Sequence, residues 1–324
     1  MGNVMPQIHS NGINIEYETF GNQQDPYLLL IAGVGQQLTM WPQAFCQLLA
    51  EKGFFVIRFD NRDVGLSTKY SESKEPGLLR LFLHQLWGGP ISPVYSLDDM
   101  TKDCVGLLDA LGIEKAHIIG ASMGGMIAQL IAANFPGKTL SLTSIMSTSG
   151  SPSLPKPAPY VVRNTFIKSI VNTKTFIINK AKYIQHNSEC LRILGSKSFP
   201  LDETTRQEIV AKDMARSFYP QGFKRQMTAI IVDGDRSLRL AKIQAPTLVI
   251  HGEQDPLFAV ECGRHTAESI PNAELACIKD MAHDLPPELY EKITGLITTH
   301  ISQHLCPGSN SLKENEHSYA DHHA

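Results

Sequence analysis

A serine, an aspartate and a histidine occur in this sequence where they could act together on one substrate. Ser122 is the centre of a Gly-x-Ser-x-Gly motif whose glycines are Gly120 and Gly124. An apolar, strand-like run covers 116–120, and a helical pattern covers 126–134. A serine on a sharp turn from strand to helix presents its hydroxyl above the sheet, and the flanking glycines leave room for that turn. We interpret this segment as a nucleophile elbow; a glycine-rich turn that only joins a strand to a helix is the alternative.

The two partners that such a serine needs follow it in the required order. The apolar run 247–251 predicts a strand, and the turn after it contains Asp255. The run 273–278 predicts another strand, followed by a loop that contains His283. Asp255 is therefore the candidate acid and His283 the candidate base, because this architecture has serine, acid and histidine in that chain order.

Each partner also has a purely structural interpretation. Asp255 precedes a proline and could be an ordinary turn residue, while Glu253 and Asp284 could be solvated loop charges. His251 ends a strand, which is more typical of a half-buried packing histidine than of a base. The three placements in one required order favour a triad over these alternatives.

The chemistry also requires donors for an oxyanion. A neutral imidazole takes the serine proton, a carboxylate fixes the imidazole tautomer, and two backbone N–H groups stabilise the developing negative charge. Met123 follows the serine at the start of a helix and supplies one N–H group. The strand-like run 27–32 leads into glycine-flanked Val34, our choice for the second donor, with Gly33 as second choice. We expect no metal and no cofactor, since the sequence contains neither a CxxC nor a His-Glu-x-x-His pattern.

These motifs resemble those of α/β-hydrolase-fold serine hydrolases, and more narrowly those of aclacinomycin methylesterase-like esterases. The similarity extends over about residues 10 to 303 and rests on the segments Trp41-Pro42, 57–63, 192–195 and 281–286. The resemblance implies an α/β-hydrolase fold and activity on esters, methyl esters included. Many relatives have His-Gly before the oxyanion N–H group, whereas this chain has Ala32-Gly33.

Composition and charge limit the partners. The 324 residues are 42% hydrophobic, with a net charge of −3. A chain of this length and composition can bury a full hydrophobic core. Its small negative net charge provides no electric field that would attract nucleic acid or an anionic membrane. No apolar stretch has transmembrane length, no secretory leader is recognisable, and the six cysteines show no paired spacing. We expect a cytoplasmic protein with no membrane insertion and with a small-molecule ester as its substrate; the oligomeric state is left open.

The alternation of strand and helix patterns predicts a mostly parallel central sheet flanked by helices. This alternation stops between 151 and 243. A proline-rich linker begins this segment and precedes helical patterns at 161–184 and 202–218. We therefore expect an α/β-hydrolase core over 1–150 and 244–306 and a helical cap over 151–243. The polar segment 307–324 is expected to be a disordered tail.

The leading hypothesis is a serine carboxylesterase that hydrolyses small to medium uncharged esters through an acyl-enzyme on Ser122. Lactone opening, amide or C–C hydrolysis and perhydrolysis could use the same triad. A non-catalytic relative that only binds a ligand is the third class.

Overall fold

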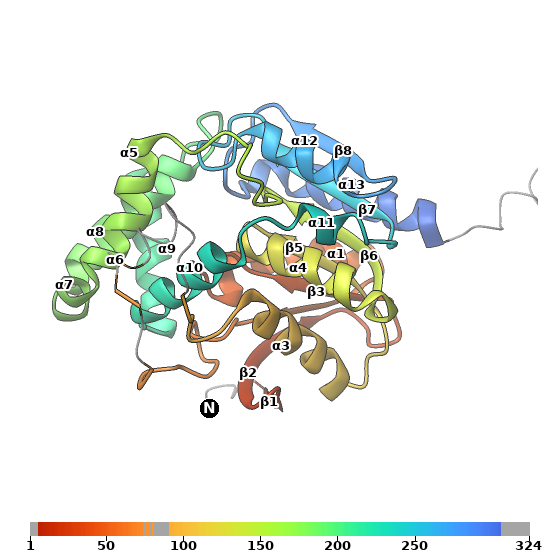
Figure 1. Ribbon diagram of the computed structural model, residues 1–324, viewed down its shortest axis with the longest axis horizontal. Helices are drawn as coiled ribbons and strands as arrows, with labels where there is room; N and C mark the ends of the chain where they lie inside the picture. The colour runs from red at the N-terminus through yellow and green to blue at the C-terminus, as the bar shows by residue number, and fades with distance from the viewer. Residues whose placement is uncertain (1–5, 74–75, 78–79, 81–90, 306–324) are drawn as a thin grey trace, which may run out of the picture.

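The computed structural model describes residues 6–73, 76–77, 80 and 91–305. Its centre is an eight-stranded sheet in the order β1-β2-β4-β3-β5-β6-β7-β8 (Figure 1). The pairs β1–β2 and β2–β4 are antiparallel, and all the other neighbours are parallel. The strands are β1 Gln7–Ser10, β2 Ile13–Phe20, β3 Tyr27–Ile31, β4 Phe55–Phe59, β5 Ala116–Ala121, β6 Thr139–Ile145, β7 Thr247–Gly252 and β8 Glu274–Ile278.

Both faces of the central strands are buried. In β3, Leu29 and Ile31 pack into one hydrophobic cluster, and Leu28 and Leu30 pack into a second cluster on the opposite face. Successive side chains of a strand point to opposite faces, so a continuous apolar run is what a strand covered on both sides requires. The mostly parallel sheet predicted from the sequence is confirmed.

Helices cover both faces of this sheet. Residues of α1 and α13 belong to the cluster that contains Leu28, and residues of α3 and α4 belong to the cluster that contains Leu29. Ser96 and Asp99 form a capping box at the start of α3, with each side chain bonded to the other's backbone N–H. The helices of the core are α1 Gln43–Glu51, α3 Leu97–Ala110, α4 Met123–Asn134, α12 Val260–Glu268 and α13 Tyr290–Leu305, with 3-10 turns η1 Leu38–Met40, η2 Pro136–Lys138 and η4 Pro287–Leu289.

A helical insert lies between β6 and β7, and most of it stands beside the sheet, at the left of Figure 1. We call its helices, Pro159 to Leu240, the cap. Its elements are α5 Pro159–Val162, the π-helix η3 Arg163–Ile167, α6 Lys168–Val171, α7 Thr173–Ile178, α8 Lys180–Leu194, α9 Glu203–Arg216, α10 Gln221–Asp233 and α11 Ser237–Leu240. The expected helical insert is confirmed, but the pattern at 161–184 is broken into several short helices, and α8 continues ten residues further, to Leu194.

Ion pairs to two buried aspartates attach the cap to the core. Arg216 of α9 lies 2.7 Å from Asp60, and Arg225 of α10 lies 2.7 Å from Asp63. Both aspartates follow β4, and their side chains are fully buried. Removing one partner of such a pair leaves an uncompensated charge, so these contacts fix where the cap sits.

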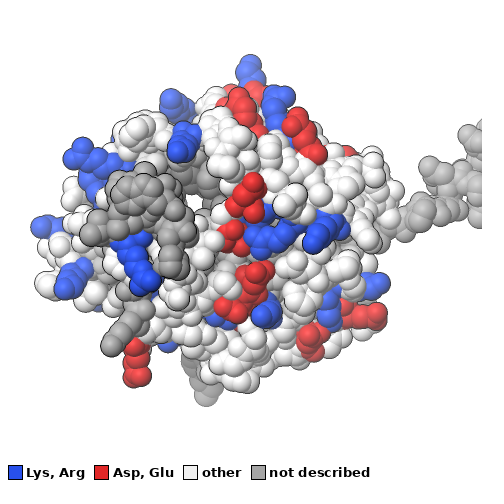
Figure 2. All heavy atoms as spheres, viewed as in Figure 1, with Lys and Arg blue, Asp and Glu red and all other residues white. Residues whose placement is uncertain are grey.

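The outer surface carries both signs of charge. On the face drawn in Figure 2, Lys and Arg prevail over the cap, and both signs are intermixed over the core. Within the described ranges, no helix is both long and apolar enough to cross a bilayer. The tail expected at 307–324 lies outside the described residues.

Candidate active site

Ser122 lies on the turn between β5 and α4, as the sequence predicted. Its φ of 56° and ψ of −119° are outside the regions that a residue with a Cβ favours. Such a conformation costs about 1–3 kcal/mol and persists only where neighbours enforce it. Here the Ser122 N–H donates to the Ile145 carbonyl at 3.0 Å, and the Ser147 hydroxyl donates to the Ser122 carbonyl at 2.8 Å.

The two glycines of the elbow are required by close backbone approaches. A Cβ at Gly120 would lie 2.0 Å from the Gly124 carbonyl oxygen, and a Cβ at Gly124 would lie 2.0 Å from the Ile31 carbonyl oxygen. Neither contact is possible for a side chain, so the motif is a steric requirement of this turn.

The structure brings Ser122, His283 and Asp255 together in one chain of contacts. Ser122 Oγ lies 3.1 Å from His283 Nε2, and His283 Nδ1 lies 2.7 Å from Asp255 Oδ2. A carboxylate only accepts hydrogen bonds, so Nδ1 carries the proton and Nε2 is free to accept the serine hydroxyl. This is the arrangement that lets an imidazole act as a base toward serine.

Asp255 is held ionised in a buried place. Burial alone would raise the pKa of its carboxyl, but interactions with His283, the Phe258 N–H and His251 bring that pKa below its ordinary value. Its Oδ1 also accepts the N–H groups of Leu257 and Phe258, at 2.8 and 2.9 Å. These bonds leave Oδ2 directed at His283.

The neighbouring carboxylates and His251 are placed differently. Glu253 is exposed to solvent, and Asp284 accepts hydrogen bonds from the backbone and hydroxyl of Ser196. His251 is fully buried, more than the half-buried state expected, and its Nε2 lies 2.7 Å from the Phe258 carbonyl oxygen. Burial holds the pKa of His251 below its ordinary value, so its ring packs as a neutral group beside Asp255.

The loop after β3 offers one uncommitted N–H group near the serine. Gly33 N–H donates to Met40 Sδ at 3.1 Å, and Gly35 N–H donates to Gln226 Oε1 at 2.7 Å. Between them, Val34 N–H has no acceptor among the described residues. A Cβ on Gly33 would lie 3.4 Å from the Ser122 Cβ, so this loop passes directly beside the serine.

Met123 N–H also has no acceptor in the described part of the chain. It is the first residue of α4, where backbone N–H groups have no partner within the helix and the helix dipole favours negative charge. The partners of Gly33 and the free N–H of Val34 favour Val34 over Gly33 as the second donor.

The loop that contains His283 is bonded to the end of α8, a feature that the sequence analysis missed. His283 N–H donates to the Leu194 carbonyl at 3.0 Å, and Ala282 N–H donates to Ser196 Oγ at 2.8 Å. Ser196 in turn donates its hydroxyl and its N–H to the Asp284 carboxylate. The cap therefore helps to hold the histidine in place.

A cavity of about 80 Å³ lies between the Val34 loop and the cap. Phe176, Tyr183 and Phe223 line it, and so do Val34 and Gly35. Its lining does not include Ser122 or His283, so this is a chamber beside the serine and not the space directly above it.

The apolar side chains of the first cap helices divide between the cavity and the surface. Phe176 and Tyr183 line the cavity, while Phe166 stacks on Phe223 at a ring distance of 6.1 Å. Ile167 and Ile177 are exposed at the surface.

Comparisons with known proteins bear on the fold and the family of this chain. The family model described as the alpha/beta hydrolase fold matches residues 26–288. The chain is 28% identical to a rhodomycin D methylesterase of a Streptomyces strain, over 90% of this chain and 96% of that protein. It is 26% identical to 3-oxoadipate enol-lactonase 2 of Acinetobacter baylyi, over 85% of this chain and 91% of that protein.

A solved structure supports the fold. The enol-lactonase from Burkholderia xenovorans superposes with a TM-score of 0.67 at 19% identity, covering 93% of this chain and 99% of that one. The resemblance seen in the sequence is thus confirmed for the fold and for the methylesterase relatives. Because the family model spans most of the chain, the protein belongs to the α/β-hydrolase family.

Proposed function

We propose that this protein is a serine carboxylesterase that forms an acyl-enzyme on Ser122. The observation that carries the proposal is the unbroken line of contacts from Ser122 Oγ through His283 to Asp255, at 3.1 and 2.7 Å. Membership of a hydrolase family and a methylesterase among the relatives support ester hydrolysis as the reaction.

In the proposed mechanism, Ser122 Oγ attacks the ester carbonyl carbon while His283 Nε2 takes the serine proton. The carbonyl oxygen becomes negative and accepts hydrogen bonds from the N–H groups of Val34 and Met123. His283 then gives its proton to the departing alcohol oxygen, leaving the acyl group on the serine. A water molecule, deprotonated by His283, attacks this acyl group, and the carboxylic acid leaves as the serine regains its proton.

An uncharged substrate fits the chamber beside the serine. Among the residues that the structure describes, none of those lining the cavity carries a formal charge. The aromatic rings of Phe176, Tyr183 and Phe223 offer apolar contact, and Ser169 and Asn187 offer hydrogen bonds. Pockets of this composition bind mainly apolar ligands and orient them with a few polar groups. We therefore assign small to medium uncharged esters, methyl esters included, as the substrate class.

Replacing Ser122 with alanine tests the nucleophile. We expect Ser122→Ala to reduce kcat for p-nitrophenyl acetate or butyrate by about 10⁴- to 10⁶-fold, as the loss of a triad serine does elsewhere. A fluorophosphonate probe should label the wild-type protein at Ser122 and leave the variant unlabelled. Circular dichroism and thermal unfolding confirm that the variant is folded. Activity of the folded variant within tenfold of wild type would refute the proposal.

A substrate panel separates esterase from lactonase, the second candidate, which the similarity to an enol-lactonase favours. Methyl and p-nitrophenyl esters of graded acyl length are compared with five- and six-membered lactones. We expect kcat/KM to be at least tenfold higher for the open-chain esters. A preference for lactones of that size would change the substrate class while leaving the role of Ser122 intact.

A further inference from the structure

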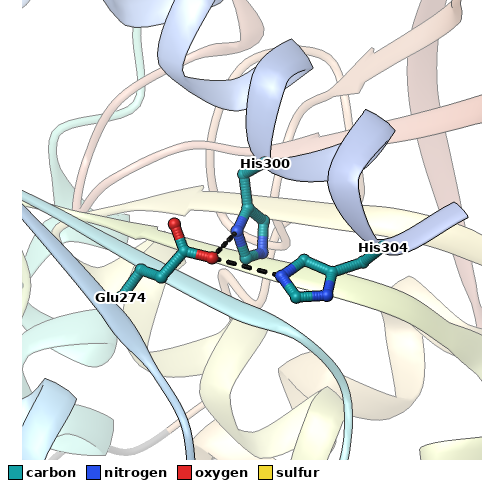
Figure 3. A group of neighbouring side chains, drawn as sticks. All are labelled: Glu274, His300 and His304. Carbon is teal, nitrogen blue, oxygen red and sulfur yellow. Dashed lines mark hydrogen bonds and ion pairs between the residues drawn. The ribbon is translucent and has the colours of Figure 1, made fainter. Parts of the chain in front are cut away.

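A second group of reactive side chains lies away from Ser122. Glu274 at the start of β8 meets His300 and His304 from the C-terminal part of α13 (Figure 3). The two histidines are four residues apart, which places them on one face of the helix. Figure 3 shows all three side chains directed toward one point.

The distances within this group are short. Glu274 Oε1 lies 2.9 Å from His300 Nδ1 and 3.1 Å from His304 Nε2. The three donor atoms all lie within 4.8 Å of one another. Around a tetrahedral Zn²⁺ with bonds of about 2.1 Å, neighbouring donor atoms are about 3.4 Å apart. Shifts of a few tenths of an ångström would bring the two distances from Glu274 Oε1 to that spacing.

Burial adds to the case. The His300 side chain is 2% exposed, while Glu274 and His304 are 47% and 41% exposed. One ligand is therefore fixed by the core, and the two others face solvent, from which an ion can enter and water can complete the coordination. Imidazole and carboxylate together suit zinc and the neighbouring divalent transition metals.

We propose that Glu274, His300 and His304 bind a divalent transition-metal ion, with Zn²⁺ as the best match. The ion takes the place of the two protons that the imidazoles now direct at Glu274 Oε1. Each proton moves to the other nitrogen of its own ring, so neutral imidazoles release no net proton. His304 can present that nitrogen to water.

This change of tautomer breaks no existing bond at His300. The other ring nitrogen of His300, Nε2, is buried and has no hydrogen-bond partner among the described residues. Nε2 therefore has no partner in either tautomer of His300, whether it carries a proton or a lone pair. A simple hydrogen-bonded cluster would explain the two contacts to Glu274. It would not give a function to the arrangement in which both imidazoles meet one carboxylate oxygen.

The ion would be structural. Glu274 is the first residue of β8, whereas His283 lies beyond the opposite end of that strand. Bound there, the ion links α13 to the strand at the edge of the sheet. Its loss should therefore lower thermal stability and leave ester hydrolysis unchanged.

The test is zinc binding to the full chain after treatment with EDTA and removal of the chelator. Isothermal titration calorimetry measures the Zn²⁺ stoichiometry and Kd, and thermal unfolding measures Tm with and without Zn²⁺. The variants are His304→Gln, which changes an exposed side chain, and Glu274→Gln. The matched control replaces His317, His322 and His323, which follow α13 in the sequence, with glutamine.

We expect wild type and the control to bind one equivalent of Zn²⁺ at this site and to gain Tm, because a ligand that binds only the folded state stabilises it. His304→Gln and Glu274→Gln should weaken this binding by about a hundredfold or more, since even outer partners of ligands are worth ten- to a hundredfold. All the proteins should keep the same kcat without metal, which shows that they are folded. The proposal would be overturned if both single variants matched wild type in zinc affinity and in Tm gain. It would also be overturned if only the control lost zinc binding and the Tm gain.

Discussion

Asp255 controls which nitrogen of His283 carries a proton. Its Oδ1 is occupied by the N–H groups of Leu257 and Phe258, so Oδ2 is the atom that faces the imidazole. The lowered pKa of Asp255 keeps this carboxylate charged at neutral pH. An asparagine of the same shape would have neither the charge nor two accepting oxygens.

We expect Asp255→Asn to reduce kcat/KM for p-nitrophenyl butyrate by about 10²- to 10⁴-fold, because an amide at this position favours the wrong imidazole tautomer. Glu253→Gln is the matched control, since it makes the same kind of change two residues away on an exposed side chain. The control should stay within about threefold of wild type. A greater loss in Glu253→Gln than in Asp255→Asn would show that the acid is misassigned.

The three residues of the proposed triad could be found in the sequence because each follows its own strand. Parallel strands end at the same edge of the sheet, so local patterns were enough to place Ser122, Asp255 and His283 near one another. The sequence could only rank Val34 before Gly33. The structure favours the same order, because the Gly33 N–H donates to Met40 Sδ at 3.1 Å, whereas the Val34 N–H has no acceptor among the described residues. No local pattern reports such a contact.

The end of α8 and the loop that contains His283 are held together as one unit. Ser196 is 2% exposed, accepts the Ala282 N–H and donates to Asp284. Without its hydroxyl, a buried N–H and a carboxylate oxygen lose their partner. The segment next to His283 would then be free to shift, and displacements of about 1 Å near reacting groups can cost a hundredfold in rate.

We expect Ser196→Ala to lower the free energy of unfolding by about 1–3 kcal/mol and kcat by about ten- to a hundredfold, with little change in KM. The matched control is Ser198→Ala, because Ser198 lies in the same segment and donates to Asp280 at the surface, at 3.1 Å. Urea unfolding and steady-state kinetics are measured for both variants. Equal kinetics in Ser196→Ala and Ser198→Ala would mean that this contact does not position the histidine.

The helices of the cap were harder to predict than the strands of the core. Helix α10 was not predicted, because the residues that it buries are largely polar or small: Gly222, Arg225, Gln226, Thr228 and Ala229. An analysis based on apolar periodicity cannot detect such a face. The group of Glu274, His300 and His304 was missed for a related reason. The four-residue spacing of the histidines was visible in the sequence, but only packing brings Glu274 to them.

The central sheet buries a titratable group between its helical layers. His117 of β5 is 2% exposed, and its Nδ1 lies 2.8 Å from Ser141 Oγ. Its Nε2 has no partner among the described residues. Burial, with a smaller contribution from His300, lowers the pKa of His117 from 6.5 to about 4. The folded protein therefore keeps this ring neutral in mildly acidic solution.

This burial predicts a loss of stability on mild acidification. Between pH 6.5 and 4 the unfolded chain binds a proton at His117 that the folded protein does not, so the free energy of unfolding falls as the pH falls. The stability that depends on a neutral His117 ring is fully present above pH 6.5. About 2 kcal/mol of this free energy of unfolding should be lost by pH 5. His117→Gln keeps a polar group beside Ser141 but cannot titrate. Urea unfolding at pH 7 and pH 5 should therefore show a smaller decrease for the variant, by about 2 kcal/mol. Equal decreases for the two proteins would show that His117 becomes protonated in the folded state without cost.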